Sequence, residues 1–133
     1  MLSDLNLPPG RTSTVIECFG LKTCVTTLHA MLSQRTDRAV IPALCFPHED
    51  GRYLLKTYPP IKPVTEDDAS TVTQQVWDVF EAEIRQRPEL WMWMYKHWRY
   101  LPGEERDPAY PAYANPSGPF RKLIAGRLRL ANI

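Results

Sequence analysis

The pattern of apolar and polar residues predicts three strands in the first half of the chain. Residues 14–19 are rich in β-branched and aromatic side chains, which favours a strand. The sequence "AVIPALCF" at 39–46 is a short continuous apolar run, typical of a strand buried on both faces, although Pro42 removes one ladder donor. After the turn sequence "PHEDG", the sequence "RYLLKTY" reads as another strand, so residues 39–58 are predicted to form a β-hairpin.

Helical spacing of apolar residues predicts three helices. The first covers residues 21–36, where an apolar stripe consists of Leu21, Val25, Leu28, Met31 and Leu32. The second runs from Glu66 to Gln86, and Thr65 with Asp68 resembles a capping box before it. Pro88 ends this helix and begins a third one, which contains residues 89–100.

The order β-α-β-β-α-α predicts an α/β fold, with helices packed on a partial mixed sheet. Residues 1–100 are predicted to form this domain. Residues 101–133 are broken by prolines and are expected to be an irregular tail. The tail closes with a short basic amphipathic segment, whose cations are Arg121, Lys122, Arg127 and Arg129.

The amino-acid composition argues against several classes of protein. The chain has 133 residues, and its 16 Lys and Arg nearly balance its 15 Asp and Glu, so no basic field favours nucleic acid. Cys18, Cys24 and Cys45 form no close pair, which favours reduced thiols over a zinc site or a disulfide framework. No signal peptide and no run of ~20 apolar residues is present, so no membrane-spanning helix is predicted.

The sequence "ELWMWMYKHWRY" at 89–100 is the densest aromatic stretch of the chain. As a helix, it would place Trp91, Tyr95 and Trp98 on one face, and the spacing alone favours packing in and around a core. The alternative is an interfacial helix, with indoles and cations at the level of lipid headgroups. The residues that would form this membrane interface are Trp91, Trp93, Lys96, Trp98 and Arg99.

Few side chains suggest chemistry. A histidine base with a carboxylate five residues later is one way to activate a hydroxyl, but His29, His48 and His97 lack such a partner. No metal site and no phosphate-binding glycine loop is predicted. Asp4 is a candidate carboxylate for substrate binding and Arg11 a candidate clamp for an anion, against the simpler interpretation of both as surface loop residues.

Four collinear segments resemble the second half of the bacterial lipid A late acyltransferases, in the lysophospholipid acyltransferase superfamily. They are "SDLNLPPGRTSTVIECFGLKTCVTTLHAMLSQRT", "AVIPALCF", "DGRYLLKTYPPI" and "FEAEIRQRPELWMWMYKHWR", and they extend from about Asp4 to Arg99. The last is the most specific, because it matches the family signature Pro-Glu-x-Trp-x-Trp-x-x-(basic)-x-Trp. In the family, an aspartate turn lines the active cleft; Asp4 matches it, and Asn6 stands where a second acid is common.

The resemblance implies a fragment of the glycerolipid acyltransferase-like fold. It also implies transfer of a fatty acyl chain from an acyl carrier protein or coenzyme A thioester to a lipid hydroxyl, at the cytoplasmic face of the bacterial inner membrane and without a bound cofactor. Because the family's His-x4-acid motif is not among these residues, we expect the general base to lie outside the chain, in a missing N-terminal half, and the chain alone to be inactive. The alternative is a non-catalytic module that binds a membrane surface or a partner, or one half of a split enzyme.

Overall fold

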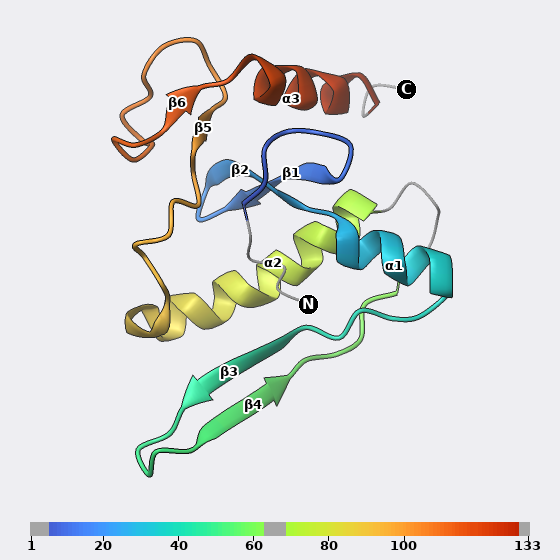
Figure 1. Cartoon of the computed structure of the whole chain (residues 1–133), viewed down its shortest axis with the longest axis vertical. Coiled ribbons are helices and arrows are strands. Elements are labelled where there is room, and N and C mark those ends of the chain that lie inside the picture. The colour runs from blue at the N-terminus through green and yellow to red at the C-terminus, as the bar shows by residue number, and fades with distance from the viewer. Residues whose placement is uncertain (1–5, 63–68, 131–133) are drawn as a thin grey trace.

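A computed structural model describes residues 6–62 and 69–130 of the chain, with the side chains of residues 127–130 left aside. Three helices and three two-stranded sheets make up this part of the chain (Figure 1). The α/β class predicted from the sequence is confirmed. In chain order, the elements are β1 Ser13–Cys18, β2 Leu21–Thr26, α1 Leu28–Thr36, β3 Ala43–Pro47, β4 Tyr53–Thr57, α2 Ala69–Gln86, η1 Pro88–Leu90, β5 Tyr100–Leu101, β6 Asn115–Pro116 and α3 Gly118–Leu130.

The predicted helix over residues 21–36 is wrong in its first half. Residues 21–26 form β2, which pairs antiparallel with β1 in a register that sets Cys18 opposite Leu21. The two residues between the strands, Phe19 and Gly20, have φ values of 55° and 78°, the positive angles of a tight hairpin turn. β-Branched side chains in β2 favour the strand, because they pack well on a pleated surface. Only Leu28–Thr36 is helical.

The predicted hairpin at 39–58 is confirmed as β3 and β4, whose register pairs Cys45 with Leu55. The expected burial on both faces is wrong, because Phe46 is the only buried residue of the two strands. The hairpin extends away from the β1–β2 sheet along one side of α2 (Figure 1). Pro42 precedes β3, where its missing N–H does not interrupt the ladder.

Helix α2 is the centre of the core, as its apolar periodicity predicts. It packs on β1 and α1, and its side chains Val76, Trp77, Phe80 and Ile84 are buried. The first three predicted residues of this helix and the proposed capping box of Thr65 and Asp68 lie outside the described residues. The turn between β1 and β2 is fixed to the helix, because the Phe19 N–H donates to Glu81 Oε2 at 2.7 Å.

The predicted helix over residues 89–100 is also wrong. After the 3₁₀ turn η1, the chain runs through tight turns, with the Trp93 N–H donating to the Trp91 carbonyl and the His97 N–H to the Tyr95 carbonyl. Tyr95 and His97 contact each other at 4.7 Å between ring centroids, a spacing of two residues that a helix places on different faces. Here the packing of the rings outweighs the helical spacing of the apolar residues, because tertiary contacts can override intrinsic helix propensity.

Residues 101–130, which were expected to be irregular, contain a short strand and a helix. The short parallel pair β5–β6 joins Tyr100 to Asn115, and α3 follows. Tyr110 belongs to the main buried cluster, and its hydroxyl donates to the Lys22 carbonyl at 3.1 Å. The division into domains at residue 100 stays a prediction.

The three cysteines differ in exposure. Cys18 and Cys24 are buried, and Cys45 is exposed on β3. Burial, together with the nearby carboxylate of Glu81, raises the pKa of the Cys18 thiol to about 12. Its thiolate, the form that reacts, is therefore scarce at neutral pH.

We expect one thiol to react with a disulfide reagent such as Ellman's reagent in the native protein at pH 8, and all three in denaturant. The serine variant Cys45→Ser should lose the fast reaction, whereas Cys18→Ser should keep it. Rapid native labelling of two or three thiols would contradict the burial of β1 and β2.

Candidate functional site

The turn before β1 is the first segment that the sequence associates with a site. Asp4 lies outside the described residues. Arg11 is exposed in a loop whose shape is held by Ser13, because the Gly10 N–H donates to Ser13 Oγ at 2.8 Å and Ser13 Oγ donates to the Pro8 carbonyl at 3.2 Å. Among the described residues, no carboxylate forms an ion pair with Arg11.

Asn6 joins this turn to the aromatic segment, here defined as residues 91–99. Its side chain is buried, and Nδ2 donates to Thr23 Oγ1 at 2.9 Å and to the His97 carbonyl at 2.6 Å. Its backbone N–H donates to Tyr95 Oη at 3.2 Å. The sequence left the role of Asn6 open. In the structure, Asn6 connects the turn before β1 to the aromatic segment, about ninety positions later in the chain. The turn and the aromatic segment, the two most informative parts of the sequence, therefore lie side by side.

The aromatic segment divides into a packed part and an exposed part. Trp91 stacks on His97 at 5.3 Å between centroids, and Trp98 is only 8 % exposed, in contact with Phe19. By contrast, Met92 and Met94 are 69 % and 92 % exposed.

The remaining members of the proposed interface are on the exposed side. Trp93 is 48 % exposed, and its indole N–H donates to the Pro88 carbonyl. Lys96 and Arg99 are exposed and lie over the rings of Tyr113 and Tyr95. Of the five residues predicted for a membrane interface, Trp93, Lys96 and Arg99 thus reach solvent, Trp91 does so in part, and Trp98 belongs to the core.

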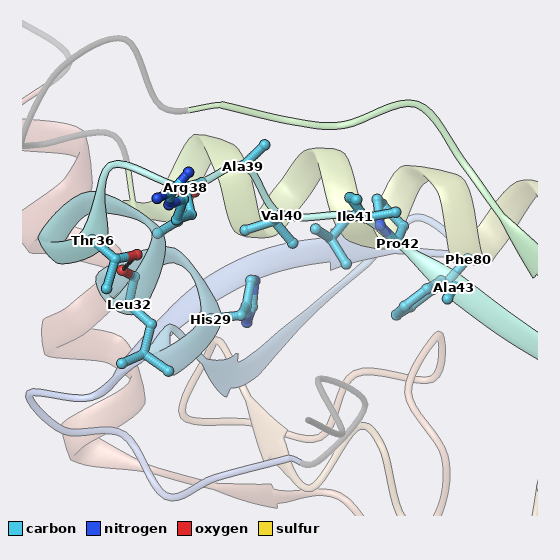
Figure 2. A pocket seen from close by; sticks show the side chains of 12 residues that line it. His29, Leu32, Thr36, Arg38, Ala39, Val40, Ile41, Pro42, Ala43 and Phe80 are labelled. Atoms are coloured by element: carbon cyan, nitrogen blue, oxygen red, sulfur yellow. Dashed lines mark hydrogen bonds between the residues drawn. The ribbon is translucent and has the colours of Figure 1, made fainter.

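The sequence missed a pocket of about 390 Å³ between α1, residues 38–43 and α2 (Figure 2). It forms because Asp37, with a φ of 50°, ends α1 in the left-handed conformation and turns the chain back along the helix. The Arg38 N–H donates to the Ser33 carbonyl at 3.1 Å, and Val40 pairs with Ile61. The segment that follows α1 is thereby held over the side chain of His29.

The buried titratable side chain of this pocket is the imidazole of His29. It is 6 % exposed, and within the described part of the chain neither ring nitrogen has a hydrogen-bond partner. Burial lowers the pKa of the imidazole, so the ring is neutral near pH 7. A sequence signal did exist, because His29, Ser33 and Thr36 recur at helical spacing on α1, but the pocket itself depends on distant residues.

The other histidines, like His29, have no carboxylate five residues later in the sequence. His48 contacts Asp50, two residues later, at 3.0 Å on the exposed turn between β3 and β4. His97 is buried among aromatic rings. Among the described residues, no group of three or more His, Cys, Asp or Glu side chains could hold a metal ion.

The sequence model of the bacterial lipid A biosynthesis acyltransferases matches residues 1–100. The chain belongs to this family. The match includes the turn before β1, both hairpins, α2 and the aromatic segment, and it ends where the collinear resemblance ends. No curated protein matches this acyltransferase-family chain. Within the part that the structure describes, none of its helices is long and apolar enough to cross a bilayer.

Proposed function

We propose that the chain takes part in the transfer of a fatty acyl chain from an acyl carrier protein or coenzyme A thioester to a hydroxyl of a lipid A precursor or lysophospholipid. The single observation that carries this proposal is the family match over residues 1–100. The reaction needs a general base to activate the hydroxyl, and hydrogen-bond donors for the oxyanion that forms on the thioester carbonyl. In this proposal, the turn with Asp4 and Arg11 lines the cleft.

We further propose that the chain corresponds to the C-terminal half of a family member, and that a His-x4-acid motif outside these residues supplies the base. The β3–β4 hairpin supports this proposal. Successive residues of a strand point to opposite faces, and Leu54 and Leu55 are 53 % and 66 % exposed. A strand that is apolar on both faces is typical of a sheet covered on both sides, so this hairpin has the composition of a docking element.

The test combines the purified chain with a separately produced N-terminal half of a lipid A acyltransferase that carries the motif. Labelled acyl carrier protein thioester and a tetra-acylated lipid A precursor are the substrates, and acylated lipid is the product measured. We expect product from the mixture and none from either half. Arg11→Ala should lower the rate about tenfold or more, because a charge-assisted contact to an anion contributes about 1.5–3 kcal/mol.

The matched control for Arg11 is Arg106→Ala, an exposed arginine between β5 and β6 that lies outside the residues of the family match. It should leave the rate unchanged. A mixture that forms no product would overturn the proposed half-enzyme, and turnover by the chain alone would overturn the external base.

The exposed part of the aromatic segment favours a second function, attachment to a membrane surface, which we place at the cytoplasmic face of the inner membrane. Residues 92–94 present two methionines and a tryptophan to solvent, next to Lys96 and Arg99. Exposed apolar side chains beside cations suit the boundary between headgroups and acyl chains. This attachment would hold the cleft against its lipid substrate.

Vesicle binding tests this surface. We expect the chain to sediment with phosphatidylglycerol vesicles, and a variant with serine at positions 92, 93 and 94 to stay in the supernatant. Replacing Lys96 and Arg99 with glutamine should weaken binding by about fivefold for each charge, because each cation contributes about 1 kcal/mol at an anionic surface. The matched control is Tyr53→Ser with Leu55→Ser, which removes exposed apolar area from β4 and should not affect sedimentation.

A further inference from the structure

The pocket beside α1 combines an apolar wall with a buried imidazole that has no hydrogen-bond partner among the described residues. Leu32, Val40, Ile41, Val76 and Phe80 contribute to the wall. The buried imidazole of His29 faces the cavity between them, with Arg38 and Thr36 toward one end and Phe80 and Ala43 toward the other in Figure 2. Its volume of about 390 Å³ lies in the range of small-molecule sites, ~300–1,000 Å³.

The imidazole is the part of the pocket that selects a ligand. Buried polar groups normally have hydrogen-bond partners, and His29 has none for Nδ1 or Nε2 among the described residues. A neutral ring offers one donor and one acceptor. A purely apolar ligand would leave both unsatisfied. A carboxylate beside the neutral imidazole would lose its hydration without a charge next to it, because the cation of this pocket, Arg38, lies toward one end.

We propose that this pocket binds a linear aliphatic chain that carries a hydroxyl group, with the hydroxyl hydrogen-bonded to His29. A hydroxyl can donate to the unprotonated nitrogen or accept from the protonated one, so it suits either tautomer of the ring. The chain lies along the wall formed by α1, α2 and residues 40–43. The inference stands on the pocket alone and does not require the acyl transfer proposed above.

The experiment compares two ligands that differ only in the polar group. Titration calorimetry of the full chain with 1-octanol and with 1-chlorooctane measures the contribution of the hydroxyl. We expect 1-octanol to bind about fivefold more tightly, because a neutral hydrogen bond contributes about 1 kcal/mol net. From 1-hexanol to 1-octanol, each methylene should tighten binding about fourfold, because its burial contributes about 0.8 kcal/mol.

The variant His29→Leu should abolish the preference for the alcohol and keep the dependence on chain length. The control His48→Leu replaces the exposed histidine of the β3–β4 turn and should change neither. If His29→Leu does not fold, the wild type still gives an answer, because the His29 ring nitrogens should shift in the NMR spectrum with 1-octanol and not with 1-chlorooctane.

Equal affinity for the two octyl ligands would overturn the proposal. So would tighter binding of octanoate than of 1-octanol, which would point to Arg38 in place of His29. The absence of saturable binding would show that the pocket takes no such chain. Loss of acyl transfer in the reconstituted enzyme would not bear on this result, since calorimetry needs only the chain itself.

Discussion

Replacing Phe120 with alanine is expected to lower the free energy of unfolding by about 3–5 kcal/mol, the usual effect of removing a buried phenylalanine. The ring of Phe120 is 0 % exposed and forms a cluster with Val15 of β1 and Cys24 of β2. Tyr100 covers it from the side, at 5.9 Å between ring centroids. A domain of this size has a stability of only about 5–15 kcal/mol, so the loss would be a large fraction of the total.

Urea unfolding followed by far-UV circular dichroism measures this change. The matched control is Tyr53→Ala, which removes an aromatic ring that is 74 % exposed and should change the stability by no more than about 0.5 kcal/mol. If Phe120→Ala unfolds at the same urea concentration as the wild type, α3 does not pack on β1 and β2 in solution. The prediction therefore also tests whether residues beyond 100 belong to the same folded unit.

Local sequence patterns were sufficient to predict α2 and the β3–β4 hairpin. The apolar residues of α2 recur at helical spacing over eighteen residues, and the buried ones face β1 and α1. The two strands of the hairpin are separated by a turn sequence, so their pairing is local. In both cases, sequence neighbours are also the structural neighbours that define the element.

The spacing of apolar residues gave a wrong prediction where the same pattern fits both a helix and a hairpin. The spacing of Leu21, Val25 and Leu28 fits a helix, yet Val25 is paired with Thr14 in a hairpin and Leu28 starts α1. The decisive signal was the Phe19–Gly20 turn, because both residues adopt positive φ. At residues 91–99, ring packing with distant Trp77 determines the path of the chain, and no local pattern encodes it.

The site was predictable only as far as the family resemblance reached. The resemblance selected the turn before β1 and the aromatic segment, and Asn6 connects them in the structure. The pocket at His29 was not predictable, because its walls come from α1, the segment before β3 and α2. Its polar group is recognisable only when the fold shows a buried histidine without a partner in the described residues.

Replacing Trp98 with alanine distinguishes the two interpretations of the aromatic segment. The indole is 8 % exposed and packs edge-on against Phe19 and His97, at 6.1 and 5.8 Å between centroids. As a core residue, it should contribute about 3–5 kcal/mol to the free energy of unfolding in solution, because a large cavity would replace it. Met94→Ala, four residues earlier and 92 % exposed, should leave the stability within about 0.5 kcal/mol of wild type.

Vesicle sedimentation of the same variants completes this test. Under conditions where both are folded, Trp98→Ala should bind phosphatidylglycerol vesicles as the wild type does, and Met94→Ala should bind less well because it lacks exposed apolar area. The opposite outcome, unchanged unfolding and lost sedimentation for Trp98→Ala, would mean that this indole faces the membrane. The packing of Trp98 against Phe19 links the aromatic segment to the turn between β1 and β2, so that outcome would also separate these two segments in solution.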